Sequence, residues 1–501
     1  MRIRLLWLAV WPLALGLPED KPYRPSIPRT WDPKAMASLQ VPLATSSASP
    51  VPASAEFYYG LPEMKILRSY PIYAPGREPA GYAEWLKQQE PELAFDPSRL
   101  RSAEDWKRAG ETVFDAPLAF ESDPFLGIVT RTLIRNPAWY LQAGIPVARD
   151  GVVPFARYVV RTKGVVEVGN LSCGMCHTRV MPDGSIIKGA QGNFPFDRTQ
   201  AFKLRAALHS PKDAHAAALE REGWRFLFAA PWLRPDPLTR IDNFSLTELA
   251  SVLESIPSGV LARHGSSPFS PVQVPDLIGV RERRYLDRTG LIRHRSIGDL
   301  MRYAALNQGG DDFSAYAGFV PAKLAEASPI RYSDEQHYAL SLYLYSLQPP
   351  QNPHSQTVLT RRGKAIFERE GCGRCHTPPL YTNNRLTPVA GFVTPREHVD
   401  VLDILPVSVG TDPELALKTR RGTGYYKVPS LKGVWYREPL EHNGSVATLE
   451  DWFDPSRLNA DYVPTGYRGF GVETRAVKGH EYGLQLSAED KACLVAFLKT
   501  L

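Results

Sequence analysis

The pentapeptide Cys-x-x-Cys-His occurs twice in this chain of 501 residues, and it constrains the fold more than any other feature. The first copy spans residues 173–177 and the second spans residues 372–376. Two cysteines three positions apart lie on one side of a single helical turn, so both can form thioether bonds to one haem edge. The residue that follows them, His177 or His376, is then the proximal iron ligand. The pattern predicts two covalently attached c-type haems. The attachment residues are Cys173, Cys176, Cys372 and Cys375.

Other uses of these cysteines do not fit their spacing. The two pairs begin 372 − 173 = 199 residues apart, whereas a zinc ribbon places its pairs roughly 15–20 residues apart. A redox dithiol does not require an adjacent histidine, and a disulfide inside either motif would close too small a loop to stabilise much. The fifth cysteine, Cys493, lies in an apolar run and is expected to be a small buried side chain.

The composition is that of a globular protein with much loop. Apolar residues make up 43% of the chain and charged residues 22%, and 45 prolines interrupt regular structure. The net charge is +6, and the basic residues are scattered. This pattern favours mild attraction to acidic surfaces, such as that of an acidic electron donor, and argues against a nucleic-acid-binding arm.

The first 16 residues resemble an export signal. Arg2 and Arg4 precede an apolar core over residues 5–13 and small residues at 14–16. The apolar stretch of about 13 residues is interrupted by Pro12 and is too short to span a membrane comfortably. We therefore expect a cleaved signal peptide, a periplasmic or secreted protein, and no stable membrane span.

An internal repeat follows from two matched segments. Residues 274–280 match residues 428–434, and residues 332–347 match residues 486–501, both at an offset of 428 − 274 = 154. The later segment contains Ser487 before acidic residues and then a helical apolar spacing, which predicts an N-capped closing helix. The repeat predicts two cytochrome c-like domains, each with a haem motif, loops and a closing helix.

These observations predict a mainly α fold with much irregular loop and an N-terminal region that wraps around the first haem domain. Helical segments are expected near residues 83–89 and 125–134. The expected divisions are a signal peptide (1–16), a Pro/Ser-rich linker (17–55), an N-terminal extension (56–165), haem domain 1 (166–350) and haem domain 2 (351–501).

The second haem has histidines available for its distal face. His480 lies just before the closing helix and is the preferred distal ligand, while His442 remains the alternative because spacing alone cannot choose between them. At the offset of 154, the corresponding residues of the first unit are Glu326 and Arg288, which are not usual iron ligands.

This asymmetry predicts a second haem with two histidine ligands and a first haem with an open face. His177 would then be the ligand of the catalytic iron, because an open iron binds O₂ or peroxide. Ligation of the first iron by His294 or Met301 would close that face. The basic segment over residues 281–285 has two interpretations, a site for haem propionates or a solvated face.

The paired motifs, the segment 428–431 and the segment 441–449 resemble the bacterial di-haem cytochrome c peroxidase superfamily. The segments 435–437 and 479–483 are most similar to the rubber-oxygenase-like branch, and the resemblance covers residues 165–501. It implies either polyisoprene cleavage by O₂ at a five-coordinate N-terminal haem beside a bis-His C-terminal haem, or peroxide reduction with electrons from a small periplasmic protein. Many of the peroxidases use a downstream Met ligand. This chain has no Met after Met301, which favours bis-His ligation.

The sequence therefore predicts an exported di-haem oxidoreductase that activates peroxide or O₂ at the first haem, while the second haem transfers electrons. An apolar organic substrate and a small periplasmic electron donor are the expected partners. The main alternative is a pure electron carrier with both haems six-coordinate. A third hypothesis is a maturation protein that acts on the side chains of another protein.

Overall fold

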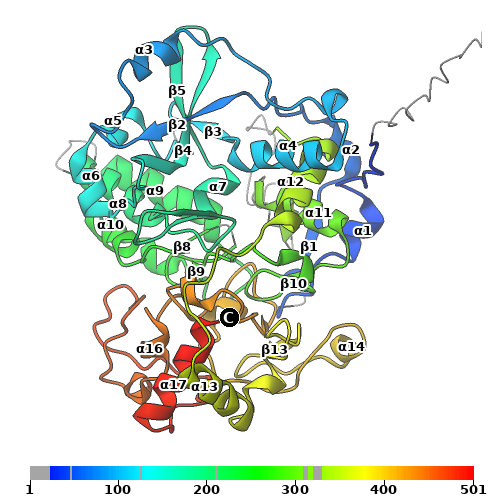
Figure 1. The fold of residues 1–501 in the computed structure, drawn as a ribbon, viewed down its shortest axis with the longest axis vertical. Helices are drawn as coiled ribbons and strands as arrows, with labels where there is room; N and C mark the ends of the chain where they lie inside the picture. The colour runs from blue at the N-terminus through cyan, green and yellow to red at the C-terminus, as the bar shows by residue number, and fades with distance from the viewer. Residues whose placement is uncertain are drawn as a thin grey trace, which may run out of the picture.

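The computed structural model describes residues 23–45, 48–123, 127–208, 213–263, 265–308, 314–316, 318–319 and 330–501. The expected signal peptide and Glu326 lie outside these residues. The described chain forms two lobes, with residues up to about 350 in the upper lobe and the remainder in the lower lobe (Figure 1). In the described ranges, none of the helices combines the length and apolarity needed to cross a bilayer.

A crossed helix pair organises the right-hand side of the upper lobe. Helix α4 (Ala103–Asp115) begins with a capping box between Ser102 and Asp105, which satisfies backbone N–H groups at its start. Its apolar face packs on helix α12 (Asp334–Ser346), and helix α11 (Ile297–Gln308) packs beside α12. Gly110 of α4 approaches α12 so closely that an added Cβ would overlap the Ala339 carbonyl oxygen.

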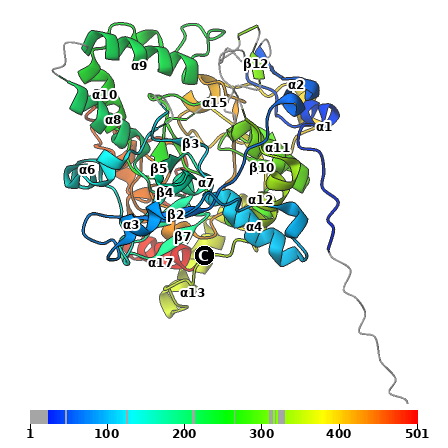
Figure 2. The same cartoon turned by 90° about the horizontal axis from the view of Figure 1, so that it is seen from above.

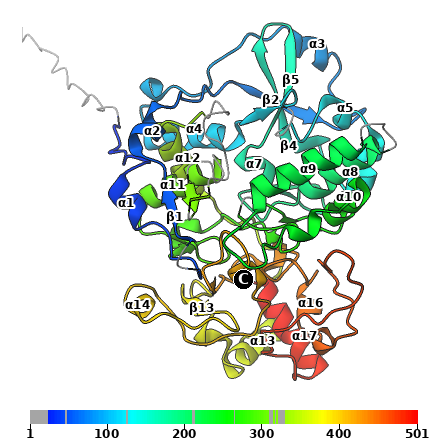
Figure 3. The ribbon, with the colours of Figure 1, turned by 180° about the vertical axis from the view of Figure 1, so that it is seen from behind.

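The lower lobe contains a second crossed pair. Helix α13 (Val358–Arg369) packs on helix α17 (Ala488–Lys499), near the C-terminus (Figure 3). Ser487 caps α17 by accepting a hydrogen bond from the Asp490 N–H, which confirms the expected closing helix. Cys493 is fully buried in the core of this lobe, as expected.

The two helix pairs make their closest contacts at matched positions. A Cβ added to Gly363 of α13 would overlap the Cys493 carbonyl, just as one added to Gly110 of α4 would overlap the Ala339 carbonyl. Cys493 and Ala339 are 493 − 339 = 154 residues apart, which is the offset between the matched segments. The next contacts follow the same offset, because Gly110 meets Tyr343 and Gly363 meets Phe497. The two helix pairs therefore share the same close glycine contact, while the internal repeat itself stays a prediction.

The upper lobe contains a four-stranded antiparallel sheet, and three of its strands lie between α4 and the first cysteine motif in the sequence. Its order is β2-β4-β5-β3, and strands β4 (Val152–Thr162) and β5 (Val165–Asn170) form its hairpin. The other strands are β2 (Ser69–Tyr73) and β3 (Ala119–Phe120). Valine-rich strands and a turn at Gly164, with φ of 82°, explain the hairpin. The mainly α expectation therefore holds only in a coarse sense: 36% of the residues that the structure describes are helical, with several small sheets.

A helical layer covers the opposite side of the upper lobe, as seen from above in Figure 2. It consists of α8 (Phe196–Ala207), α9 (Asp213–Phe228) and α10 (Leu246–Glu254), whose buried residues form one apolar cluster. The expected helix near 83–89 is α3 (Tyr82–Lys87). Near 125–134 the described helix is α5 (Arg131–Ile134), and residues 124–126 lie outside the description.

Short elements complete the two lobes. The remaining α-helices are α1 (Pro33–Ala37), α2 (Ala55–Gly60), α6 (Pro137–Ala143), α7 (Cys173–Cys176), α14 (Arg396–Val399), α15 (Glu414–Leu417) and α16 (Leu449–Trp452). The paired short strands are β1 (Pro50–Pro52) with β12 (Ser314–Tyr316), β6 (Thr178–Val180) with β7 (Ile186–Lys188), β8 (Val260–Leu261) with β9 (Val272–Gln273), β10 (Tyr285–Leu286) with β11 (Ile292–Arg293), and β13 (Leu386–Pro388) with β14 (Tyr425–Lys427).

Candidate haem sites

Each cysteine motif folds as one helical turn. In the first motif, Ser172 caps α7 and the His177 N–H donates to the Cys173 carbonyl over 2.9 Å. In the second, the turn spans Cys372–Arg374, and the His376 N–H donates to the Cys372 carbonyl over the same distance. Both motifs therefore have the single-turn geometry that the spacing predicts.

The four motif cysteines are neutral thiols. Burial raises the pKa of Cys173 to about 12 and that of Cys176 to about 11. Burial likewise raises the pKa of Cys372 to about 11, and it raises the pKa of Cys375. With no metal or haem bound, burial therefore favours the neutral thiol form of all four cysteines.

The two proximal histidines share one kind of hydrogen bond, and His376 Nδ1 also lies 3.2 Å from the Tyr381 carbonyl. His177 Nδ1 donates to the carbonyl of Pro275 over 3.0 Å, and His376 Nδ1 donates to that of Pro429 over 3.1 Å. Pro275 and Pro429 are equivalent residues of the two matched segments. A histidine that donates from Nδ1 to a carbonyl has its Nε2 lone pair free for a metal and its ring fixed in orientation.

His480 faces His376. Their ring centroids lie 6.2 Å apart, and two imidazole nitrogens that each bind one metal at about 2 Å place the ring centroids roughly that far apart. The Nδ1 atom of His480 is buried and has no hydrogen-bond partner in the described protein. Burial, and secondarily the charge of His376, lower the pKa of His480 to about 3, so its ring is neutral, as a metal ligand must be.

The backbone around His480 fixes this position. His480 adopts φ of 47°, in the left-handed region that costs energy for most residues. Its N–H donates to the Val409 carbonyl over 2.6 Å, and its carbonyl accepts from Arg457 over 2.9 Å. The strained conformation is held from both sides, which is typical of functional positions. The residues present therefore fit a haem iron between His376 and His480.

His442 has a different environment. Its Nδ1 lies 2.5 Å from the Glu441 carboxylate, and its ring stacks on Tyr426 with centroids 4.6 Å apart. Its carbonyl accepts from the Gln273 N–H of the upper lobe over 2.8 Å. His442 thus lies at the interface between the lobes, with its ring engaged by a carboxylate and a tyrosine.

His294 and Met301, the two candidates for a second ligand of the first iron, lie in different environments. His294 is held at both ring nitrogens, with Nδ1 2.7 Å from the Arg283 carbonyl and Nε2 2.6 Å from the Tyr345 hydroxyl. Met301 is fully buried in the core cluster against which Cys173 packs. Among the residues described, no second histidine ring faces His177 as His480 faces His376.

Asp197 is a buried carboxyl group near the first motif, and no sequence motif marks it. Its side chain is 4% exposed and accepts a hydrogen bond from the Ala262 N–H over 3.1 Å. Burial raises the pKa of Asp197 to about 8. After burial, Arg263 and Asp197 are the charges that perturb the pKa of Cys176, so both lie in its surroundings. A carboxyl group that holds a proton at neutral pH is suited to proton transfer.

Comparisons with known proteins were made at three levels. No protein-family model and no curated protein matches the chain. Among solved structures, it is similar to Kuenenia stuttgartiensis hydrazine synthase pressurised with 20 bar xenon (16% identity, 60% of this chain and 92% of that chain, TM-score 0.30). It is also similar to a MauG-like protein associated with microbial copper homeostasis (23%, 35% and 62%, TM-score 0.21). A third similar structure is the diheme peroxidase BthA from Burkholderia thailandensis E264 (17%, 87% and 93%, TM-score 0.30).

Proposed function

We propose that this chain is an exported di-haem c-type oxidoreductase with one open haem and one closed haem. The first haem would be attached to Cys173 and Cys176 with His177 as its ligand. The second would be attached to Cys372 and Cys375 with His376 and His480 as its ligands. The observation that carries the proposal is the difference between the two histidines: His376 faces a second neutral imidazole at 6.2 Å, and His177 has no such counterpart in the described residues.

When bound, the haems supply one-electron chemistry and, at an open iron, the activation of peroxide or O₂. The protein's contribution is to fix and tune them. Pro275 accepts from His177 Nδ1–H, and this hydrogen bond orients the ring and raises the basicity of the opposite nitrogen. Pro429 does the same for His376, and His376 and His480 together would hold the second iron. Asp197, whose pKa burial raises to about 8, would hold a proton beside the first motif near neutral pH.

The oxidant and substrate follow from the resemblance. The rubber-oxygenase-like segments favour O₂ and an apolar organic substrate, whereas the wider superfamily favours peroxide and a small periplasmic electron donor. Stoichiometric consumption of O₂ with polyisoprene latex, or of peroxide with a reduced small cytochrome, distinguishes the two.

Low-temperature EPR of the ferric holoprotein, with and without cyanide, tests the proposal. We expect one high-spin and one low-spin signal, and only the high-spin signal should shift with cyanide. Two low-spin signals that do not shift with cyanide would contradict an open first haem and favour the alternative of a pure electron carrier. In that case Met301 is the ligand to examine first, because His294 is engaged at both ring nitrogens.

A further inference from the structure

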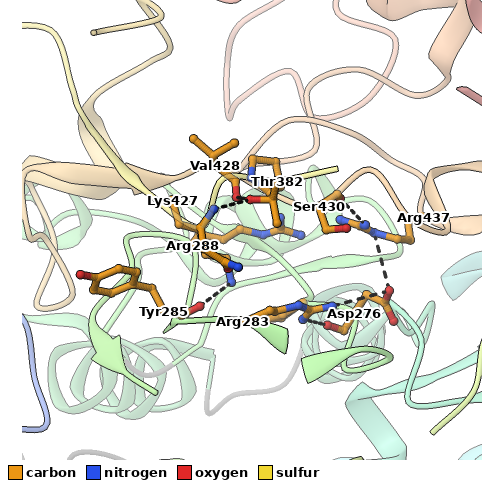
Figure 4. A pocket seen from close by; sticks show the side chains of 12 residues that line it. Asp276, Arg283, Tyr285, Arg288, Thr382, Lys427, Val428, Ser430 and Arg437 are labelled. Atoms are coloured by element: carbon orange, nitrogen blue, oxygen red, sulfur yellow. Dashed lines mark hydrogen bonds and ion pairs between the residues drawn. The ribbon is translucent and has the colours of Figure 1, made fainter. Parts of the chain in front are cut away.

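A small cavity lies between the two lobes, where the loops that hold the proximal histidines approach each other. Its volume is about 20 Å³, and its wall includes Pro275 and Pro429, whose carbonyls accept from His177 and His376. Figure 4 shows charged side chains converging on this cavity from both lobes. They are Asp276, Arg283, Arg288, Lys427 and Arg437.

Arg283 braces the first of these loops. Its Nη1 donates to the main-chain carbonyl of Asp276, and its Nη2 donates to that of Ile278 over 2.7 Å. These two carbonyls belong to the residues one and three positions after Pro275. The guanidinium therefore holds the backbone of the loop whose proline carbonyl accepts from His177 Nδ1.

Arg437 makes the same contact with the second loop. Its Nη1 donates to the main-chain carbonyls of Ser430 and Lys432, over 2.7 Å and 2.8 Å. These residues again lie one and three positions after the proline, which here is Pro429. Arg437 and Arg283 are 437 − 283 = 154 residues apart, the offset of the matched segments. One pattern of hydrogen bonds therefore occurs at both proximal loops.

A short 3₁₀ turn brings each arginine back to its loop. The turns span Val280–Glu282 and Val434–Tyr436. Each turn begins directly after a glycine in the left-handed conformation, with φ of 73° at Gly279 and 71° at Gly433. The arginine is the next residue after each turn, so the local backbone of both loops sets up the contact.

The Asp276 carboxylate lies between the two arginines. It is 2% exposed, and it is 3.9 Å from Arg283 and 3.8 Å from Arg437. It also accepts a hydrogen bond from the Tyr436 hydroxyl of the lower lobe over 3.2 Å. The arginine side chains are themselves only 14% and 10% exposed. Because a buried cation is costly without an anion nearby, this carboxylate helps to keep both arginines in place.

We propose that Arg283 and Arg437 are positioning residues for the two proximal histidines, each acting through the loop that it braces. This inference rests on the two haem attachments of the proposed function. A carbonyl that accepts from Nδ1–H of a ligating histidine makes the opposite ring nitrogen more basic. A more basic ligand stabilises the ferric iron, and hydrogen bonding of this kind tunes the reduction potential of a haem. Each arginine therefore lowers the potential of its own haem by keeping the proline carbonyl in place.

The reduction potentials of charge-conserving variants test the proposal. Spectroelectrochemical titration of the holoprotein should show one potential raised in Arg283→Lys and the other potential raised in Arg437→Lys. Lysine keeps the cation, but it is shorter and has a single donor nitrogen, so it cannot reproduce the contact with both carbonyls. Arg284→Lys is the matched control, because this side chain is 62% exposed in a surface pair with Asp403.

The sign of the shift distinguishes positioning from general loosening of the structure. Water admitted beside the haem would lower the potential, because water stabilises the more highly charged ferric iron. Lowered potentials, potentials equal to those of Arg284→Lys, or a rise in the same potential in both variants would overturn the proposal. If one variant does not fold with both haems, the other decides the matter for its own loop.

The outcome is separable from that of the proposed function. The pyridine haemochrome spectrum counts the attached haems, and fewer than two in the wild-type protein would contradict the haem attachments themselves. The two potentials are measured whether the first haem is open or closed, so the EPR and cyanide result is independent of them.

Discussion

The imidazole rings of His376 and His480 face one another with their centroids 6.2 Å apart, although they belong to opposite ends of the lower lobe's sequence. Their spacing suits one metal ion, and both rings are held in the neutral form by burial, which lowers the pKa of each.

Replacement of His480 by alanine should convert the second haem from low spin to high spin, because one of its two axial ligands is lost. The first haem should be unaffected. EPR and the visible absorption spectrum of the ferric protein measure the change. His442→Ala is the control, since His442 is engaged by Glu441 and Tyr426. An unaltered low-spin signal in His480→Ala would refute the ligand assignment and favour His442.

Replacement of Met301 by leucine should leave the spectrum of the first haem unchanged. Met301 is fully buried in an apolar core cluster, and leucine fills nearly the same volume. Such a volume-conserving change usually costs less than about 1.5 kcal/mol of stability. Ferric EPR with and without cyanide is the measurement. A new high-spin signal in the variant would identify Met301 as an axial ligand and support the electron-carrier alternative.

Replacement of Gly363 by alanine should destabilise the lower lobe, since the new methyl group would overlap the Cys493 carbonyl and the Phe497 side chain. Overpacking of this kind typically costs about 1–3 kcal/mol or more. Gly110→Ala should do the same to the upper lobe through Ala339. Gly223→Ala is the matched control, because Gly223 lies in helix α9 and its added methyl meets nothing within 4 Å. Chemical unfolding of the holoproteins, followed by circular dichroism, measures the difference; equal stability of Gly363→Ala and Gly223→Ala would contradict the close packing.

Replacement of Asp197 by asparagine should flatten the dependence of stability on pH above pH 6.5. Because burial raises the pKa of Asp197 to about 8, the folded state binds a proton that the unfolded state has released above pH 4. The wild-type free energy of unfolding therefore falls as pH rises from about 4 to 8, by at most about 1.4 kcal/mol per pH unit from this group. Buried histidines oppose this trend only below pH 6.5, because their pKa values are lowered. Parallel pH profiles for the two proteins would contradict the raised pKa.

The sequence predicted the features that depend on local pattern. The turns at Cys173 and Cys372 and the closing helix capped by Ser487 need only short-range spacing, and the structure has them. The Arg283 and Arg284 pair shows the limit: both belong to the basic segment with two interpretations, yet Arg283 points inward and Arg284 outward. The burial of Arg283 depends on the lower lobe, which brings Lys427 and Arg437, far away in sequence, to the same cavity.

The sheet between α4 and the first motif was missed for a related reason. The segment carries no chemical motif, and the helix that pairs with α12 was not expected so far before Cys173. In the structure, α4 contacts α12 through Gly110 and Ala339, as α13 contacts α17 through Gly363 and Cys493. The offset of 154 residues identifies α12 and α17 as equivalent helices, but it does not identify their partners α4 and α13.

That inserted sheet has a consequence for the order of folding. Gly110 and Ala339 are 339 − 110 = 229 residues apart, whereas Gly363 and Cys493 are 493 − 363 = 130 apart. Loop-closure entropy grows only with the logarithm of length, so the longer span costs roughly 0.5 kcal/mol more. Long-range contacts slow folding far more than they weaken the folded state. The upper lobe should therefore close later than its sequence position suggests, which leaves Cys173 and Cys176 accessible for the haem attachment proposed above until α12 packs on α4.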